Sequence, residues 1–456
     1  MQGPLSPLEI VILAAGQGRR MASARPKVLH TLAGRPLLAH VLETARSVHP
    51  QAIHVVYGHG GELVRAAFAA DTVSWVLQAE RRGTGDALRQ ALPAIAGEAR
   101  VLVLLGDVPL LTPATVQALL DTAPDRLTLL TFLAEGPNQY GRIVRDAGGS
   151  VARIVEWRDA TPEERDLREV NSGILVAPAA DLRRWVPQLA ADNAQGEFYL
   201  TDIVALARAE GAQVAALHPL DPTEVDGVNA RTDLARLERI YQHRAARRLL
   251  DAGVQLADPA RFDLRGTLDA GQDVFIDINC VIEGHVRLGD RVFVGPGCII
   301  RNSTIGADTR IEAYSVIDGA EIDHHAALGP FARVRPSTRL GPHTRIGNFV
   351  EAKACVMGEG SKANHLSYIG DTDIGCHVNI GAGVITCNYD GVHKHRTTIG
   401  DHAFVGSDTQ LVAPVTVGAG ATIGAGSTIT KDAPRDQLTL SRSSQKTVAG
   451  WRRPEK

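Results

Sequence analysis

Residues 11–21, VILAAGQGRRM, place a short apolar run directly before a Gly-Gln-Gly turn. An apolar strand that ends in a glycine-rich turn is typical of the first unit of a nucleotide-binding α/β domain, but the dinucleotide fingerprint requires a third glycine. Met21 occupies that position. Free backbone N–H groups and the two arginines after the turn both attract anions, so the turn favours phosphate binding. An ordinary strand-to-helix connection remains an alternative for this segment taken alone.

The region up to about residue 229 alternates short apolar runs with helical patterns. The runs are IVILAA, AIHVVYG, VLVLLGD, LTLLTFLA and SGILVAP. Strands that alternate with helices predict βαβ units, a mostly parallel sheet and a ligand crevice at the carboxyl ends of the strands. Gly16 and Asp107 each follow such a run, so both are expected at that crevice.

A different pattern covers residues 229–253. Apolar residues recur every three to four positions among many charges, which predicts one amphipathic helix of about 20 residues that ends near Gly253. We expect this helix to connect two domains.

The rest of the chain carries a hexapeptide repeat. Aliphatic residues recur mostly six apart, and glycine often follows them, at Ile276, Ile282, Leu288, Val294, Ile300, Ile305, Ile311, Ile317, Ile322, Leu328, Val334, Leu340, Ile346, Ile399, Val405, Leu411, Val417, Ile423 and Ile429. This period predicts a parallel β-helix in which the repeated aliphatic side chain points inward. Residues 347–368 and 381–398 break the rhythm with polar and titratable side chains, and we expect them to form loops on a binding face, although disordered excursions would also fit.

Composition narrows the class of protein. The net charge of −3 over 456 residues gives no support to a nucleic-acid or membrane surface, and no apolar run approaches the ~20 residues of a membrane span. The five cysteines are odd in number and form no CxxC pair, which argues against a disulfide framework or a thiolate zinc site. We therefore expect a soluble, cytoplasmic protein.

The motifs taken together carry a family resemblance over nearly the whole chain. LAAGQGRRM, PKVLHTLAGRP, LQAERRGTGDAL, GDVPLL, YGRIV, NSGILVA and NAQGEFYLTDI precede a hexapeptide half with GNFVEAKA, SKANHLSYIGD and NIGAGVITCNYDG. This order resembles the bacterial bifunctional N-acetylglucosamine-1-phosphate uridylyltransferases / glucosamine-1-phosphate N-acetyltransferases. The resemblance implies that acetyl-CoA acetylates glucosamine-1-phosphate, and that the product then reacts with UTP to give UDP-N-acetylglucosamine and pyrophosphate.

The same resemblance implies an architecture. A Rossmann-like nucleotidyltransferase domain with a mixed, mostly parallel sheet is expected over residues 1–229, a helical linker over 230–253, and a left-handed parallel β-helix that carries the acetyltransferase over 254–456. The family also implies a homotrimer through the β-helix and Mg²⁺ as the metal.

Uridylyl transfer joins two anions, so charge neutralisation and positioning are the main catalytic requirements. Lys27 and Arg20 are the expected catalytic cations, and Asp107 with Asn229 the expected Mg²⁺ ligands. By residue-by-residue matching, the nucleotide contacts are Leu13, Ala14, Ala15, Gly16, Lys27, Gln78, Gly83, Thr84, Leu105, Gly106, Asp107 and Asn229, and the sugar contacts are Gly141, Glu156 and Asn171. Leu105 departs from a family position that is often tyrosine.

Acetyl transfer requires removal of a proton from the attacking amine, and imidazole, which titrates near ~6.5, suits that role. His365 is the expected base, with Glu351 as the carboxylate that orients it. The resemblance assigns Arg335, Lys353, Tyr368 and Asn379 to the sugar phosphate, and Ala382, Asn388, Tyr389, Ser407, Ala425 and Arg442 to acetyl-CoA and the reaction centre. Asn364, beside the base, stands where glycine is common.

Two other functions remain open at this point. The chain could be a monofunctional sugar-1-phosphate nucleotidyltransferase with a structural or regulatory β-helix, or a hexapeptide acyltransferase with a degenerate N-terminal domain. The cluster around His365, Lys353 and Asn388 opposes the first alternative. The intact glycine-rich turn, Lys27 and Asp107 oppose the second.

Overall fold

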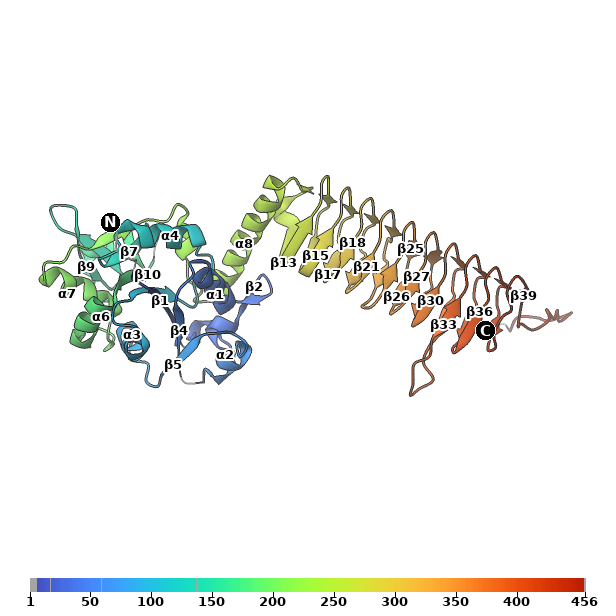
Figure 1. The fold of residues 1–456 in the computed structure, drawn as a ribbon, viewed down its shortest axis with the longest axis horizontal. Helices are drawn as coiled ribbons and strands as arrows, with labels where there is room; N and C mark the ends of the chain where they lie inside the picture. The colour runs from blue at the N-terminus through green and yellow to red at the C-terminus, as the bar shows by residue number, and fades with distance from the viewer. Residues whose placement is uncertain (1–5, 17, 59, 137, 455–456) are drawn as a thin grey trace. The chain divides into compact units, whose positions relative to one another are not determined.

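The computed structural model describes residues 6–16, 18–58, 60–136 and 138–454. The chain forms two compact units, one up to Tyr241 and one from Gln242 onward. Figure 1 shows an α/β unit and a stack of short strands, labelled in chain order.

The first unit is built on a nine-stranded sheet in the order β11-β7-β10-β6-β1-β4-β5, with β8 and β9 attached through β10. Neighbours β6, β1, β4 and β5 are parallel, while β10 runs antiparallel to β6 and β7. The strands are β1 (Leu8–Leu13), β4 (Ala52–Gly58), β5 (Ser74–Gln78), β6 (Arg100–Leu105), β7 (Thr128–Leu133), β8 (Arg142–Arg145), β9 (Val151–Val155), β10 (Glu169–Pro178) and β11 (Ala215–Leu217), and β2 (Thr31–Leu32) pairs separately with β3 (Arg35–Pro36).

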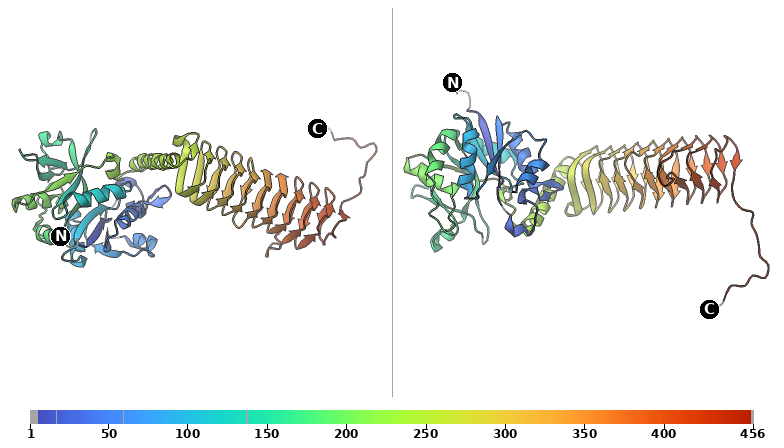
Figure 2. Two further views of the ribbon diagram at one scale, coloured as in Figure 1. Left: turned by 45° about the horizontal axis from the view of Figure 1, so that its top comes forward. Right: turned by 90° about the horizontal axis from the view of Figure 1, so that it is seen from below.

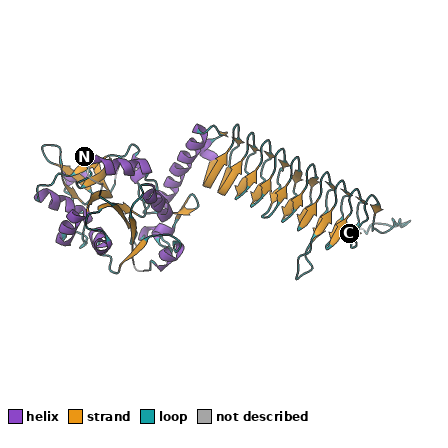
Figure 3. Cartoon of the chain, viewed as in Figure 1, coloured by secondary structure: helices purple, strands orange, loops and turns teal. Residues whose placement is uncertain are grey.

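Helices cover both faces of this sheet (Figure 3). Ile10 and Ile12 of β1 are buried in one core with α1, whereas Val11 between them is buried in the opposite core with α3. This alternation follows from the period of two along a strand. The helices of this unit are α1 (Leu37–Ser47), α2 (Glu62–Ala67), α3 (Thr84–Ala91), α4 (Pro113–Thr122), α5 (Pro162–Arg165), α6 (Ala179–Trp185) and α7 (Ile203–Ala209), and the division between the two units falls within α8 (Arg231–Asp251).

Helix α8 (Arg231–Asp251) is the helix predicted from the amphipathic pattern of residues 229–253. The Asp233 carboxylate accepts hydrogen bonds from the backbone N–H groups of Asn229 and Ala230, which satisfies donors at the start of the helix. Leu237 is buried in a small core with Met21. Met21, the residue that breaks the dinucleotide fingerprint, thus anchors the segment after the glycine-rich turn.

The second unit is a parallel β-helix, and Figure 2 shows its coils from two further directions. One sheet follows the order β12-β14-β16-β19-β22-β25-β28-β31-β34-β37-β39, and a second sheet wraps through the remaining strands. Phe275 pairs with Phe293 and Arg310 with Ala327, so each coil advances the chain by 17 or 18 residues there. The repeated aliphatic residues, such as Ile276, are buried, as the hexapeptide period predicts.

The eleven-stranded sheet contains β12 (Gln255–Leu256), β14 (Phe275–Ile276), β16 (Phe293–Val294), β19 (Arg310–Ile311), β22 (Ala327–Leu328), β25 (Arg345–Asn348), β28 (Lys362–His365), β31 (Asn379–Ile380), β34 (Phe404–Val405), β37 (Thr422–Ile423) and β39 (Leu438–Thr439). The seventeen-stranded sheet contains β13 (Phe262–Ala270), β15 (Cys280–Leu288), β17 (Ile299–Arg301), β18 (Thr304–Ile305), β20 (Val316–Asp318), β21 (Glu321–Ile322), β23 (Arg333–Val334), β24 (Arg339–Leu340), β26 (Glu351–Lys353), β27 (Val356–Met357), β29 (Tyr368–Gly370), β30 (Thr372–Ile374), β32 (Ile385–Cys387), β33 (Thr397–Ile399), β35 (Gln410–Val412), β36 (Val415–Val417) and β38 (Thr428–Ile429).

One edge of the β-helix carries the residues of the second site. On successive coils the backbone turns at this edge through residues of positive φ: Tyr314, Phe331, Phe349, Leu366, Gly383, Asp408 and Gly426. His365 directly precedes Leu366, and we call this feature the His365 edge. Large side chains rarely adopt positive φ, and three of the four that do so on successive coils stack ring on ring: Tyr314, Phe331 and Phe349.

The expectation that residues 347–368 leave the solenoid is wrong. They form β26, β27 and β28 in the regular stack, with Ala352, Met357 and Ala363 buried at the inward positions. The sequence rhythm is hard to see there because small residues and a methionine replace the usual aliphatics. Residues 388–396 do leave the coil, as a short excursion closed by a bridge between Tyr389 and Lys394.

The mixed, mostly parallel sheet and the parallel β-helix agree with the fold expected from the sequence. In the part of the chain that the structure describes, no helix is both long and apolar enough to cross a membrane.

Candidate active sites

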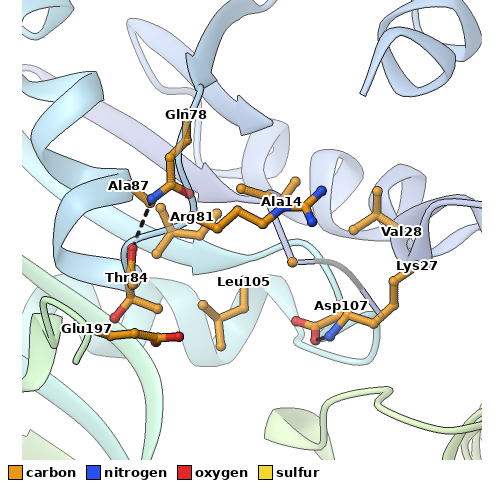
Figure 4. Close-up of a pocket in the computed structure, with 14 residues that line it drawn as sticks. Ala14, Lys27, Val28, Gln78, Arg81, Thr84, Ala87, Leu105, Asp107 and Glu197 are labelled. Atoms are coloured by element: carbon orange, nitrogen blue, oxygen red, sulfur yellow. Dashed lines mark hydrogen bonds and ion pairs between the residues drawn. The ribbon is translucent and has the colours of Figure 1, made fainter. Parts of the chain in front are cut away.

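A cavity of about 540 Å³ lies at the carboxyl ends of β1, β5 and β6. Figure 4 shows Lys27 and Asp107 at one end of it and Thr84 and Glu197 at the other. Parallel strands end at one edge of a sheet, which explains why segments far apart in sequence meet here. Ten of the expected nucleotide contacts line this cavity: Leu13, Ala14, Ala15, Gly16, Lys27, Gln78, Gly83, Thr84, Leu105 and Asp107.

The Gln78 amide is held rigidly inside the cavity wall. Its Nε2 donates to the Gly83 carbonyl at 3.0 Å and to Asp86 Oδ2 at 2.9 Å, and the residue is 3% exposed. Both N–H groups are therefore used within the protein, and Oε1 is the atom that can accept from a base N–H.

Charged groups meet at the other end of the cavity. Lys27 Nζ forms an ion pair with Asp107 Oδ2, and both side chains are mostly buried. Asn229 lies near the same carboxylate, because a Cβ at Gly227 would lie 3.9 Å from Asp107 Oδ2 and 3.9 Å from Asn229 Nδ2. The two expected metal ligands are thus close together, with a lysine beside them.

A smaller cavity of about 110 Å³ adjoins the first and shares Leu13, Thr84 and Leu105 with it. Glu156 and Asn171, two of the expected sugar contacts, line this second cavity. The third is adjacent, because the Gly141 carbonyl accepts from the Asn171 backbone N–H at 2.9 Å.

Glu156 is tied to its surroundings by one hydrogen bond. Thr201 Oγ1 donates to Glu156 Oε1 at 3.0 Å, and burial of the carboxyl raises its pKa above the ordinary value. A carboxyl held in this way can accept from, or donate to, a hydroxyl of a bound ligand.

Four expected contacts lie outside the lining described for these cavities: Asn229 and Gly141, placed above, and Gly106 and Arg20. Gly106 packs against Ala14 and Val28 instead, since a Cβ there would lie 3.1 Å and 3.2 Å from their side chains. Arg20 is exposed and lines neither cavity. The sequence reasoning missed Arg81 and Glu197, which do line the larger cavity; the arginine pair in the motif QAERRGTG was the available signal.

In the second unit, Asn348 lies beside the expected base. The β25–β28 register pairs Asn348 with His365, and His365 Nδ1 lies 2.9 Å from Asn348 Oδ1. An amide oxygen only accepts, so Nδ1 carries the hydrogen and the lone pair of Nε2 is available.

The orienting role expected for Glu351 stays a prediction. Glu351, on β26, accepts a hydrogen bond at Oε1 from Arg335 Nη1 at 2.7 Å, while Asn348 is the residue paired with His365 on the preceding coil. Asn364 causes no irregularity: it lies inside β28, outside the set of positive-φ residues.

A cluster of polar side chains lies across β29 from His365. Asp371 Oδ2 accepts from Lys353 Nζ at 3.3 Å and also from Asn388 Nδ2, which itself lies 3.5 Å from the Tyr368 hydroxyl. Contact with Lys394, and then with Asp371, raises the pKa of Lys353 above its usual value, while Lys353 lowers the pKa of Lys394. Lys394 was not foreseen, because only the fold brings the excursion onto this coil, and Asp371 ends the motif SKANHLSYIGD without having been assigned a role.

The residues expected to bind acetyl-CoA follow the His365 edge. The Ala382 carbonyl accepts from Asp408 N at 2.7 Å, and the Ser407 carbonyl accepts from Gly426 N at 2.8 Å, so these residues lie on successive coils. Arg442 Nη1 donates to the Ala425 carbonyl at 2.9 Å. A row of small residues thus runs beyond the base, formed by Ala382, Ser407 and Ala425. Tyr389, a few residues after Ala382 in the sequence, has a side chain that is 60% exposed.

Comparison with known families assigns both units. Residues 10–257 match the MobA-like NTP transferase domain, and residues 271–302 and 396–431 match the bacterial transferase hexapeptide (six repeats). Two solved structures, a nucleotidyl transferase from Methanothermobacter thermautotroptrophicus and a UDP-glucose pyrophosphorylase complexed with UDP-glucose, each align with 52% of this chain and with 97% and 98% of their own. Their TM-scores of 0.37 and 0.42, at 19% and 15% identity, are too low to bear on the function.

Curated relatives cover nearly the whole chain. Bifunctional protein GlmU of Alkalilimnicola ehrlichii is 55% identical over 447 residues, which are 98% of this chain and 96% of that protein. Bifunctional protein GlmU of Paraburkholderia phytofirmans is 56% identical over 450 residues, which are 98% of this chain and 99% of that protein. Because the similarity spans both units, and both carry the side chains expected of their reactions, the chain belongs to the family of the bifunctional GlmU proteins.

Proposed function

We propose that this bifunctional enzyme of UDP-N-acetylglucosamine synthesis performs its two reactions at the two sites described above. The second unit transfers acetyl from acetyl-CoA to glucosamine-1-phosphate, and the first transfers UMP from UTP to N-acetylglucosamine-1-phosphate. The observation that carries the proposal is that each unit gathers its own charged cluster, Lys27 with Asp107 in one and Lys353 with Asp371 in the other. The monofunctional alternative is not favoured, since the bifunctional relatives match the chain from end to end.

In uridylyl transfer, an oxygen of the sugar phosphate attacks the α-phosphorus of UTP, a new P–O bond forms, and the bond to pyrophosphate breaks. Lys27 offsets negative charge on the phosphates, and the glycine-rich turn supplies backbone N–H groups. Gln78 Oε1 accepts from the uracil, while Glu156 and Asn171 hold the sugar in the adjoining cavity. Arg20 stays a predicted phosphate contact that requires movement of its exposed side chain.

The residues near Lys27 fit a divalent cation. A carboxylate and an amide oxygen are donors that Mg²⁺ takes, and phosphate oxygens and water complete its usual six positions. Asp107 and Asn229 would hold the ion, which supplies further neutralisation of phosphate charge when bound. Lys27, paired with Asp107 in the free protein, is then available to the substrate.

In acetyl transfer, His365 Nε2 removes a proton from the amine of glucosamine-1-phosphate as the nitrogen attacks the thioester carbonyl. The C–N bond forms, the C–S bond breaks, and the thiolate of coenzyme A leaves. Asn348 fixes the imidazole tautomer from below. The sugar phosphate is bound by Lys394 together with Arg335, Lys353, Tyr368 and Asn379. The row of small residues along the His365 edge leaves room for the acetyl-CoA arm.

Removal of the Asn348 side chain isolates its positioning role. In Asn348→Ala we expect kcat of acetyl transfer to fall about 10- to 100-fold, because the imidazole loses its fixed orientation, with KM for glucosamine-1-phosphate nearly unchanged. Asn348→Asp keeps an acceptor for Nδ1–H and should retain most of the activity. An unchanged kcat in the alanine variant would remove Asn348 from the mechanism.

The His365 edge also supports a homotrimer through the β-helix. Tyr314, Phe331 and Phe349 stack at 5.3 Å between ring centroids, yet they are 58%, 47% and 57% exposed. A contiguous exposed apolar row of this kind is typical of a surface that another subunit covers. Neighbouring copies would then also enclose Ser407, Ala425 and Arg442, which lie exposed along the same edge.

Phe331→Asp tests this association. We expect the trimer to dissociate to monomers and acetyl transfer to fall about tenfold or more, since a buried unpaired charge costs several kcal/mol. Folding should survive, because aspartate tolerates the φ of 57° at this position better than phenylalanine does. The measurement is light scattering coupled to size exclusion, with Leu220→Asp, at a fully exposed site in the first unit, as the control. A variant that remains trimeric would exclude the edge as the interface.

One assay tests both reactions together. The full chain is given glucosamine-1-phosphate, acetyl-CoA, UTP and Mg²⁺, and free thiol and pyrophosphate are followed separately. Both signals are expected, and the pyrophosphate signal should require acetyl-CoA when glucosamine-1-phosphate is the only sugar supplied. Thiol without pyrophosphate would support a pure acyltransferase, and neither signal would overturn the proposal.

A further inference from the structure

A third cavity, of about 260 Å³, lies behind the glycine-rich turn. It shares Ala14, Ala15, Gly16 and Arg81 with the nucleotide cavity. It shares no lining residue with the sugar cavity, which adjoins the nucleotide cavity through Leu13, Thr84 and Leu105. The three cavities therefore follow one another, with the nucleotide cavity in the middle.

The lining of this rear cavity suits an anion. The side chains described around it include Arg25 and Arg81, the Ser23 hydroxyl and Tyr57, and they include no carboxylate. The nucleotide cavity, in contrast, is lined by Asp107 and Glu197. Two guanidinium groups with no acid in the same wall make a region of positive potential.

The backbone of the wall is arranged around Arg81. A Cβ at Gly58 would lie 2.9 Å from the Ala15 carbonyl oxygen and 3.0 Å from Arg81 Nε, so the glycine lets the arginine cross between the two cavities. Figure 4 shows the Arg81 side chain extended across the nucleotide cavity toward Ala14.

Arg25 also acts on the nearby His30 imidazole. Burial, and then the charges of Arg231 and Arg25, lower the pKa of His30 below its ordinary value.

The order of the cavities matches the geometry of the reaction. In phosphoryl and nucleotidyl transfer the attacking and leaving oxygens lie roughly in line on opposite sides of the phosphorus. A sugar phosphate that enters from the side of Glu156 and Asn171 directs the leaving group away from the sugar cavity. The rear cavity shares no lining residue with the sugar cavity and adjoins the nucleotide cavity through other residues, so it can receive that group.

We propose that Arg25 and Arg81 bind the β- and γ-phosphates of UTP in the rear cavity and then the pyrophosphate released there. This inference rests on the proposed uridylyl transfer and adds two cations to it. The two arginines stabilise the negative charge that collects on the bridging oxygen as its bond to the α-phosphorus breaks. In the reverse direction they hold inorganic pyrophosphate for attack on the UDP-sugar.

The test uses the reverse reaction of the full chain, with UDP-N-acetylglucosamine and inorganic pyrophosphate as substrates. In Arg25→Gln and in Arg81→Gln we expect KM for pyrophosphate to rise about tenfold or more, because each variant loses one charge-assisted contact. KM for UDP-N-acetylglucosamine, and KM for the sugar phosphate in the forward direction, should stay within about twofold of wild type. Arg81→Lys should recover part of the loss, as a cation without the guanidinium fork.

The matched control is Arg82→Gln. Arg82 adjoins Arg81 and carries the same charge, but it pairs with Glu80 and Asp86 outside the rear cavity. The inference would be overturned if KM for pyrophosphate changed no more in the two cavity variants than in this control. It would also be overturned if KM for the sugar phosphate rose in those variants as much as KM for pyrophosphate.

Failure of the inference can be told apart from failure of the proposed function. A wild-type chain that releases no pyrophosphate from UTP would contradict uridylyl transfer itself. A wild-type chain active in both directions, with variants that respond normally to pyrophosphate, would contradict only the roles of Arg25 and Arg81. Thermal unfolding of each variant shows whether a loss reflects folding instead, and calorimetric titration with inorganic pyrophosphate alone then measures binding without turnover.

Discussion

Replacement of Asp107 by alanine is expected to abolish uridylyl transfer while the same chain continues to acetylate glucosamine-1-phosphate. The rate of pyrophosphate release should fall about 10³-fold or more, because the variant loses the carboxylate proposed to hold the divalent cation and leaves Lys27 without its partner. Release of free thiol from acetyl-CoA should be unchanged, since the second unit contains its own set of side chains.

The acetyl transfer rate serves as the internal control for folding of the Asp107 variant. Asp107→Asn keeps the size of the side chain and one oxygen donor, so it should retain more activity at high Mg²⁺ than the alanine variant does. Uridylyl transfer at the normal rate in Asp107→Ala would eliminate this residue as a metal ligand and would shift attention to Glu197 on the opposite wall.

Replacement of His365 by alanine is expected to give the reciprocal result. Acetyl transfer should fall about 10²- to 10⁴-fold, the usual contribution of a positioned general base, while uridylyl transfer from supplied N-acetylglucosamine-1-phosphate proceeds normally. Thiol release and pyrophosphate release from the same sample measure both outcomes.

His402→Ala provides the comparison for His365. His402 is an exposed imidazole elsewhere on the β-helix, stacked on His377 at 5.2 Å, and its removal should leave both activities intact. Acetylation at the wild-type rate in His365→Ala would refute its role as the base. Loss of acetylation in both histidine variants would point to damage to the coil stack.

Much of the nucleotide site could be foreseen from the sequence because parallel strands impose a simple rule. A residue that follows a buried strand must lie at the carboxyl edge of the sheet, and Gly16 and Asp107 both obey this rule. The inward positions of the β-helix could be predicted equally well from the sequence, since a six-residue period leaves little choice of which side chain points inward. Arg81 escaped notice because its place depends on Gly58, which lies on another strand.

The second site was harder to predict because its contacts depend on the length of each coil. Asn348 and His365 meet because they are 17 residues apart on coils that pair in that register. A coil one residue longer would bring a different residue beneath the imidazole. Sequence reasoning proposed His365 as the base and took Glu351 as its carboxylate partner from the family resemblance, but it offered no signal for Asn348.

The excursion at residues 388–396 has a consequence for how the acceptor site can change. Asn379 pairs with Phe404, 25 residues later, and yet the strands on either side of the excursion stack in the ordinary parallel register. The added length is thus absorbed entirely outside the coil, and it brings Lys394 to the site. Substitutions, insertions or deletions confined to this excursion could redesign recognition of the acceptor sugar without moving His365 or any coil beneath it.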